Sequence, residues 1–186
     1  TDGNSEIVIA NRQGRAIRFH ESKVREMGRT ATGVNAMAID KANGDEVVGM
    51  VAVADKTETV LVVSEKGYGK RSQLDENGEP IAIYRVTNRG GKGVKTMNIT
   101  EKTGKLVSIK LVDDSNDIMI INKSGMAIRM HVSDIRVMGR ATQGVRLINL
   151  ERRNDEIAAV CKVDADIEEE NDTVDNTDDN TTNVSE

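Results

Sequence analysis

Arginine side chains recur beside glycines in three related segments of this chain, and both residue types suit contact with phosphate groups. The segments are MGRTATGV (27–34), TNRGGKGV (87–94) and MGRATQGV (138–145), which we call the glycine phrases. Glycine leaves backbone N–H groups open to an approaching anion, and an adjacent guanidinium adds positive charge. The glycines also permit tight turns, and the two roles are compatible. We therefore predict that the aligned residues Arg29, Arg89 and Arg140 contact phosphates.

Further basic residues accompany each glycine phrase, and a second group lies on a neighbouring hairpin. A row of such charges can neutralise phosphates along a curved path. The alternative is that each is an ordinary solvated side chain on the face of a strand. The predicted DNA-contacting set is Arg12, Arg15, Arg18, Lys23, Arg25, Arg29, Lys66, Lys70, Arg71, Arg85, Arg89, Lys92, Lys95, Lys123, Arg129, Arg136, Arg140 and Arg146.

Residues for catalysis or metal binding are scarce. The two histidines, His20 and His131, occupy the same place in related segments, whereas a catalytic pair needs different roles at one place. They do not combine with the single cysteine, Cys161, in any zinc-ligand spacing. The segment GYGKRS (67–72) lacks the spacing of a phosphate-binding P-loop. The sequence thus predicts no enzyme site, no metal and no cofactor in this chain.

Three sequence repeats position the basic residues. Residues 13–34 align without gaps to residues 124–145, with twelve identities in 22 positions, and a more diverged copy lies between them. The middle copy carries an insertion near residues 75–81, and correcting for it gives a period of about 51–53 residues. All three copies share a turn glycine, at Gly14, Gly67 and Gly125.

Each repeat has the pattern of β-strands. An apolar run rich in Ile and Val precedes a polar turn that ends in glycine, as in a hairpin. After the turn, the alternation in AIRFH (16–20) predicts Ile17 and Phe19 on one side of a strand and Arg18 and His20 on the other. A second pair of strands is predicted in each repeat, at 34–39 and 46–53, at 94–99 and 105–112, and at 145–150 and 156–163.

Four strands repeated at this period are typical of propeller blades. We predict an all-β fold, a β-pinwheel or propeller-like array with about four antiparallel strands per blade. A closed propeller needs about four to eight blades, so three repeats predict an open arc. The predicted blades are 1–55, 56–115 and 116–163.

The charge of the chain is divided between a basic body and an acidic tail. Ten of the 31 acidic residues and none of the 26 basic residues lie in 164–186, a segment that predicts a disordered tail. No apolar run is long enough for a membrane span, and no secretory signal is present. The single cysteine fits a reducing cytoplasm. The chain opens at Thr1 in mid-pattern, so we expect it to be a piece of a longer polypeptide.

The scarcity of aromatic residues indicates the kind of nucleic acid. With two Tyr, one Phe and no Trp, the chain offers few platforms on which single-stranded bases could stack. No segment predicts a helix suited to the major groove. We therefore predict sequence-independent contact with the backbone of duplex DNA, together with bending of the duplex.

Residues 14–34, 67–72 and 84–94 resemble the C-terminal domain of the bacterial DNA gyrase A subunit, and the resemblance covers about residues 5–163. It implies a β-pinwheel whose blades exchange strands. It also implies that duplex DNA wraps around the rim, which promotes negative supercoiling by a type II topoisomerase. The implied partners are the rest of the gyrase A protein and its B subunit, in a bacterial cytoplasm, with ATP and Mg used by the holoenzyme. By the same resemblance the acidic tail tunes wrapping, and we expect it to inhibit DNA binding.

The sequence departs from the family pattern in one respect. The DNA-wrapping box of the family, Q-R-R-G-G-K-G, belongs to its first blade, whereas the nearest match here is NRGGKG (88–93) in the middle repeat. We interpret this match as a related loop of a later blade, with the first blades and the catalytic tyrosine upstream of this chain. Tyr68 and Tyr84 match no catalytic position. Two alternatives stay open: the C-terminal domain of the topoisomerase IV A protein, and a propeller-like scaffold that binds proteins.

Overall fold

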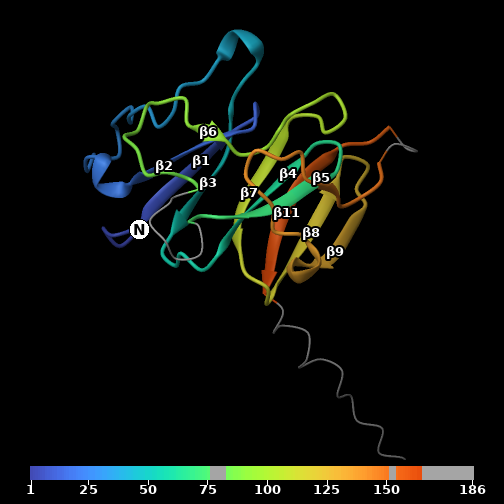
Figure 1. Ribbon diagram of the computed structural model, residues 1–186. Helices are drawn as coiled ribbons and strands as arrows, with labels where there is room; N and C mark the ends of the chain where they lie inside the picture. Colours follow the sequence, from blue (N-terminus) through green and yellow to red (C-terminus); the bar gives the residue numbers. More distant parts are fainter. Residues whose placement is uncertain (76–82, 151–153, 165–186) are drawn as a thin grey trace, which may run out of the picture.

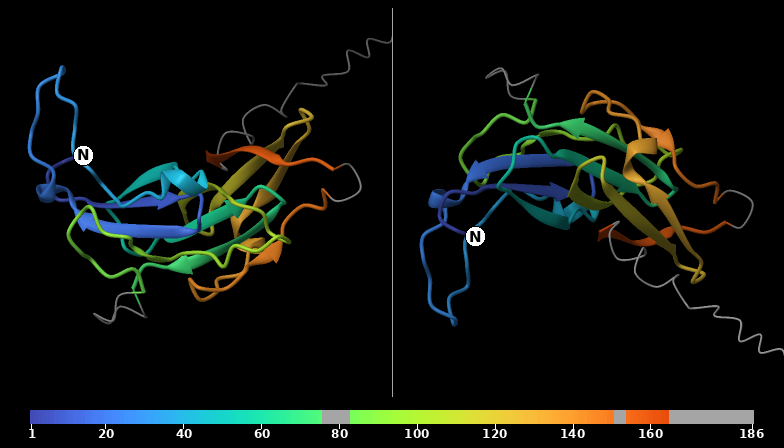
Figure 2. Two further views of the ribbon diagram at one scale, coloured as in Figure 1. Left: turned by 90° about the horizontal axis from the view of Figure 1, so that it is seen from above. Right: turned by 90° about the horizontal axis from the view of Figure 1, so that it is seen from below.

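The computed structural model describes residues 1–75, 83–150 and 154–164. Three antiparallel sheets follow one another along the molecule in a curved row (Figures 1 and 2), which confirms the predicted all-β array of blades. The elements are β1 (Glu6–Asn11), β2 (Arg15–His20), η1 (Glu21–Lys23), η2 (Lys41–Asn43), β3 (Val47–Val53), β4 (Thr59–Ser64), β5 (Tyr68–Gln73), β6 (Val94–Lys95), β7 (Leu106–Val112), β8 (Asn116–Asn122), β9 (Ala127–His131), η3 (Val132–Asp134), β10 (Val145–Arg146) and β11 (Ile157–Asp164), where η marks a 3₁₀ turn.

The first two sheets are each completed by a strand from the next repeat. The first sheet has the order β3-β1-β2-β6, and β6 joins it from the middle repeat by pairing Lys95 with Arg15. The second sheet has the order β10-β5-β4-β7, and β10 joins it from the third repeat by pairing Arg146 with Tyr68. The third sheet, β11-β8-β9, has three strands within the described residues. Strand exchange between blades, which the resemblance implied, is therefore present.

The exchanged strands are much shorter than predicted. The predictions at 46–53, 105–112 and 156–163 are confirmed by β3, β7 and β11, but 94–99 and 145–150 keep only the two-residue strands β6 and β10, and 34–39 forms no strand. After β6 the N–H groups of Thr96 and Met97 both donate hydrogen bonds to the carbonyl oxygen of Gly14, at 2.8 and 3.1 Å. This turn ends the ladder and lays the chain over the hairpin of the preceding repeat.

Neighbouring sheets pack face to face, so the strands between them are buried on both sides. Val60 and Val62 of β4 lie in a core shared with Val8 of β1, whereas Leu61 lies in a second core shared with Ile118 of β8. The alternation of a strand with period two therefore does not separate a core face from a solvent face in this stack.

A phrase loop surrounds each glycine phrase, and we define the three loops as residues 23–35, 83–95 and 134–146. The second and third loops lie against the preceding sheet, where Thr87 N–H donates to Arg18 O and Met138 N–H donates to Arg71 O, both at 2.8 Å. The first loop extends away from the sheets (Figure 2). As a result Val24 is 37% exposed, whereas the aligned residue of the third loop, Ile135, is 1% exposed.

Two predictions fall largely outside the described residues. The predicted insertion near 75–81 overlaps residues 76–82, and the predicted acidic tail overlaps residues 165–186. Within the described part of the chain, no helix has the length and apolar character needed to cross a membrane.

Candidate nucleic-acid interface

Three cations at the hairpin turns bind neighbouring groups of the protein. Arg12 forms ion pairs with Glu46 at 2.9 Å and with Glu65 of the next repeat at 3.3 Å. Lys123 pairs with Glu156 at 2.5 Å. The Lys66 amine donates to the carbonyl oxygen of Glu101 at 2.5 Å. The sequence placed these cations in the DNA-contacting set, but the structure uses them at junctions between strands.

Arg18 is buried, although the alternation along β2 predicted an outward position. Its side chain is 1% exposed and forms ion pairs with Glu6 and with Asp75, the latter at 2.7 Å. It also donates to the carbonyl oxygens of Leu74 and Tyr84, at 3.3 and 3.0 Å. The prediction that Arg18 contacts DNA is wrong, because the next repeat covers this face of the sheet and the guanidinium clamps the two repeats together.

The aligned arginines of the other repeats follow the same pattern. Arg71, whose side chain is 7% exposed, donates to Ile135 O at 2.8 Å and pairs with Asp114 at 2.5 Å. Arg129 pairs with the buried Asp117 at 2.6 Å. Asp117 also accepts from His131 at 2.6 Å; burial opposes ionisation of Asp117, but the hydrogen bonds from these two groups hold its pKa below the usual value. Arg71 therefore also leaves the predicted set.

Lys70 is the third basic residue that is buried rather than exposed. Its side chain has no solvent-exposed surface, and its amine donates to Gly139 O and Arg140 O at 2.7 and 2.6 Å. Burial, with a smaller contribution from the positive charge of Arg140, lowers the pKa of Lys70 to about 7. The prediction that Lys70 contacts DNA is wrong for the same reason as for Arg18, because the next repeat covers it.

The cations of the phrase loops are arranged differently. Within residues 1–75, 83–150 and 154–164, no ion pair joins a cation of loops 23–35 or 83–95, or Arg136 or Arg140, to a carboxylate. Arg146 of the third loop lies 5.5 Å from the centre of the Tyr68 ring and donates to its hydroxyl at 2.9 Å. The exposed cations of the loops are Lys23, Arg25, Arg29, Arg85, Arg89, Lys92, Lys95, Arg136 and Arg146.

Two of the aligned phrase arginines link one loop to the next. Arg89 donates to the carbonyl oxygens of Lys23 and Asn35, both at 3.0 Å, and Arg140 donates to Lys95 O at 2.8 Å. Because Lys95 aligns with Asn35, the same contact is repeated from one repeat to the next. The contacts order the loops into one continuous edge. They also occupy part of each guanidinium that was predicted to contact phosphate.

A different aligned trio is best placed to meet a ligand. Arg25, Arg85 and Arg136 lie four residues before the arginines of the glycine phrases, and all three side chains are exposed. Arg15 joins the same edge, because it is exposed and donates to Gly93 O at 3.2 Å. The sequence placed all four in the predicted set but did not single them out. The signal available in the sequence was the arginine that recurs four residues before the phrase arginine in each repeat.

The carboxylates that pair with the strand arginines were not predicted from the sequence. Glu6 and Asp117 each stand twelve residues before their arginine partners, Arg18 and Arg129, and this repeated spacing was visible. Asp75 belongs to the next repeat, 57 residues from Arg18, and no local pattern indicates it.

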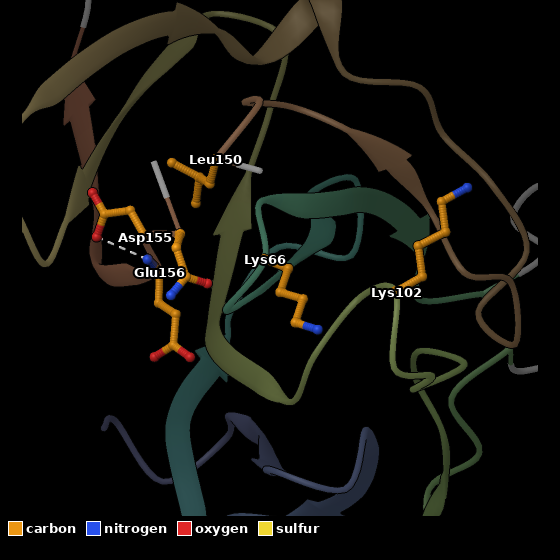
Figure 3. Close-up of a pocket in the computed structure, with 6 residues that line it drawn as sticks. Lys66, Lys102, Leu150, Asp155 and Glu156 are labelled. Atoms are coloured by element: carbon orange, nitrogen blue, oxygen red, sulfur yellow. Dashed lines mark hydrogen bonds between the residues drawn. The ribbon is translucent and has the colours of Figure 1, made fainter. Parts of the chain in front are cut away.

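A cavity of about 260 Å³ beside the third sheet mixes both signs of charge. Its lining includes the amines of Lys66 and Lys102, which point in different directions, while the carboxylates of Asp155 and Glu156 lie on the other side (Figure 3). Among the described residues, no group of three or more His, Cys, Asp and Glu side chains is arranged to hold a metal ion. The cavity therefore does not concentrate charge of one sign, and the phrase-loop edge is the stronger candidate for a binding site.

The fold and the basic edge define a class of repeat protein in which strand-exchanging blades present arginine-rich loops. The family model described as "DNA gyrase C-terminal domain, beta-propeller" matches residues 5–54, 58–76, 80–113 and 116–162, so the chain belongs to this family. The DNA gyrase A subunit of Staphylococcus aureus (strain MRSA252) is 47% identical over 173 residues. That alignment covers 92% of this chain but 18% of the relative, so the chain spans about a fifth of the length of such relatives.

Solved structures agree with this assignment. The C-terminal domain of DNA topoisomerase IV superposes with a TM-score of 0.78 and 25% identity, covering 89% of this chain and 48% of that one. The DNA gyrase A C-terminal domain superposes with a TM-score of 0.73 and 26% identity, covering 86% and 50%. The structural score is slightly higher for topoisomerase IV, whereas the curated relative with 47% identity belongs to a gyrase.

Proposed function

We propose that this chain is part of the C-terminal domain of a DNA gyrase A protein and that its phrase-loop edge binds the backbone of duplex DNA. One observation carries the proposal. The hairpin cations Arg12, Arg18, Arg71 and Lys123 pair with carboxylates, whereas the cations of loops 23–35 and 83–95, together with Arg136, are exposed and form no ion pair with a carboxylate of the described residues. Uncompensated positive charge along one edge is the electrostatic footprint of a phosphate-binding surface.

The geometry favours contact with the duplex backbone over reading of bases. The helices among the described residues are three-residue turns, too short to enter a major groove. Tyr84 is fully buried and Tyr68 is 6% exposed, so neither offers a stacking surface for bases. The curved row of blades (Figure 2) carries the loops along an arc, and bending a duplex of 20–30 bp along such an arc costs on the order of 1–6 kcal/mol. Repeated phosphate contacts offset that cost, so we propose that the edge bends DNA and contributes to wrapping.

The wider assignment follows from the family and is part of the proposal. The holoenzyme would be a type II topoisomerase in a bacterial cytoplasm, with the gyrase B protein as partner and with ATP and Mg used elsewhere in the assembly. This chain would supply DNA binding without a cofactor of its own. The acidic segment 164–186 would compete with DNA for the basic edge and weaken binding.

The test is the affinity of the 186-residue chain for a duplex across a series of salt concentrations. Each neutralised phosphate contributes about −0.9 to the slope of log affinity against log salt. We expect a slope of about −4 or steeper, because several exposed cations act together. A flat dependence, or binding that does not require a duplex, would contradict the proposal and favour a protein-binding scaffold.

A further inference from the structure

The middle sheet contains a buried amine where the other two sheets carry isoleucine. Lys70 stands three residues after the turn glycine of its repeat, and the aligned residues are Ile17 and Ile128. Ile17 is 2% exposed and serves as an ordinary core residue, whereas Lys70 is fully buried beneath the third phrase loop. A buried amine is costly unless its hydrogen-bonding capacity is used, so this substitution within a repeated framework needs a physical reason.

Three acceptors converge on this amine. Gly139 O and Arg140 O lie at 2.7 and 2.6 Å from Nζ, and Ser72 Oγ lies at 3.2 Å. The Ser72 hydroxyl donates its own hydrogen to Met138 O at 2.9 Å, so its oxygen acts as an acceptor toward Lys70. Three acceptors require three N–H donors, which only the charged ammonium form supplies. The observed arrangement is therefore that of protonated Lys70.

The groups held by the ammonium belong to the DNA-binding edge. Gly139 and Arg140 form the centre of the third phrase loop, and Arg140 in turn donates to Lys95 O of the second loop at 2.8 Å. Among the described residues, the charged and titratable groups that face this region are the guanidinium of Arg140 and the phenol of Tyr84. Tyr84 bonds Thr96 at 2.6 Å, and burial raises its pKa, so it stays neutral.

Resting on the proposed function, we propose that Lys70 is a positioning residue for DNA binding: its ammonium holds the third phrase loop in the conformation that presents Arg140, and protonation of Lys70 is coupled to phosphate binding at that loop. The coupling has an electrostatic origin. In the free protein, burial and the charge of Arg140 both oppose the ammonium form, with a pKa of about 7. A phosphate beside Arg140 offsets the positive charge there and raises the pKa of Lys70.

The sign of the effect follows from linkage. Because the pKa of Lys70 is higher in the complex, binding takes up a proton when the pH lies above about 7. Affinity is therefore highest below that pH and falls as the pH rises through the interval between the free and bound pKa values. A rise of one pKa unit on binding corresponds to about a six-fold loss of affinity between about pH 6.5 and 8.5.

The experiment compares the 186-residue chain with Lys70→Met and with a matched charge-loss control, Lys110→Met on β7, in duplex binding at both pH values. Between the lower and the higher pH, we expect the affinity of the wild type and of the control to fall about six-fold. The affinity of Lys70→Met should fall by about two-fold or less. Equal pH dependence in all three proteins would overturn the coupling. If the wild type binds no duplex at either pH, the proposed function is overturned instead.

Two measurements on the free protein test positioning without DNA. Amide hydrogen exchange at residues 138–142 should be faster in Lys70→Met than in the wild type, and unchanged exchange there would overturn the positioning role. In case the variant does not fold, the lysine Cε signals of the wild type should show one amine titrating near pH 7 that moves upward when a duplex is added. The absence of such a signal, or its failure to move, would also overturn the proposal.

Discussion

The first hairpin and the second phrase loop lie against each other, and both are rich in cations. In the hairpin region, Arg12 and Arg18 are tied to carboxylates, and Arg18 is closed off from solvent. In the loop, Arg85 and Lys92 are exposed and unpaired within the described residues. The difference lies in what surrounds each cation, because the stack of sheets covers the hairpin strands on both faces and leaves the outer side of the loops uncovered. Recurrence of a cation with the repeat is thus compatible with two opposite roles.

The largest expected effect comes from removing a cation of the hairpin region. Arg18→Met leaves Glu6 and Asp75 without their shared partner, and breaking a buried ion pair in this way costs about 3–5 kcal/mol of unfolding free energy. Arg25→Met, the matched change in a phrase loop, should alter stability by less than about 0.5 kcal/mol. Urea denaturation of both variants measures the difference. Equal losses would remove the distinction between the two regions.

The next effect tests whether a phrase loop packs on the preceding sheet. Gly93 has a φ of 67°, and a Cβ there would lie 2.2 Å from Ala16 O, whereas the aligned Gly33, with a φ of 89°, has nothing within 4 Å. Both Ala variants lose about 1–2 kcal/mol from the left-handed backbone, and Gly93→Ala should lose about 1–3 kcal/mol more from overpacking. Thermal or urea unfolding would show the ordering, and a greater loss in Gly33→Ala would contradict it.

DNA binding should separate the two regions in the opposite direction. Changing Arg25, Arg85 and Arg136 together to Gln should make the salt slope shallower by about 2.7, at about 0.9 for each lost phosphate contact. The double variant Arg12→Gln and Lys123→Gln, which removes hairpin cations that pair with carboxylates, should leave the slope unchanged. A slope that responds to the hairpin variant and not to the loop variant would reverse our assignment of the interface.

The smallest effect concerns the pH dependence of stability. The pKa of Lys70 is about 7 in the folded protein and about 10.5 when unfolded, so unfolding takes up a proton between those values. Stability therefore rises with pH in that window, by up to about 1.4 kcal/mol per unit. Lys70→Met lacks this contribution, so the free energy of unfolding of the wild type should rise relative to that of the variant by about 2 kcal/mol between pH 7 and 9. A constant difference in urea denaturation across this range would contradict the lowered pKa.

Much of the fold could be predicted because repetition marks it in the sequence. The turn glycines, the apolar runs and the alternation after each turn locate β1, β2 and their counterparts. The exchanged strands were predicted too long because their length depends on where the chain turns onto another repeat, as Thr96 and Met97 do at Gly14. No local propensity encodes that contact.

The candidate site was predicted less completely. Buried and exposed arginines both recur once in each repeat, so the sequence pattern does not distinguish them. What separates Arg18 from Arg25 is a set of acceptors that includes Tyr84 O, 66 residues away, and such a partner is invisible before the sheets are stacked. The exposed members, Arg25, Arg85 and Arg136, were in the predicted set because their spacing repeats, but the pattern could not rank them above the rest.

Strand exchange also sets the order in which the molecule can be completed during synthesis. The sheet that begins at Glu6 is closed by the pairing of Arg15 with Lys95, so the ribosome must deliver most of the second repeat before the first sheet has its final edge. Until then β2 presents an unpaired edge to its surroundings. During synthesis, the sheet of the most recent repeat therefore lacks its last edge strand until the next repeat emerges. A ribosome that stalls between repeats would leave the edge of that sheet exposed to pairing with other chains.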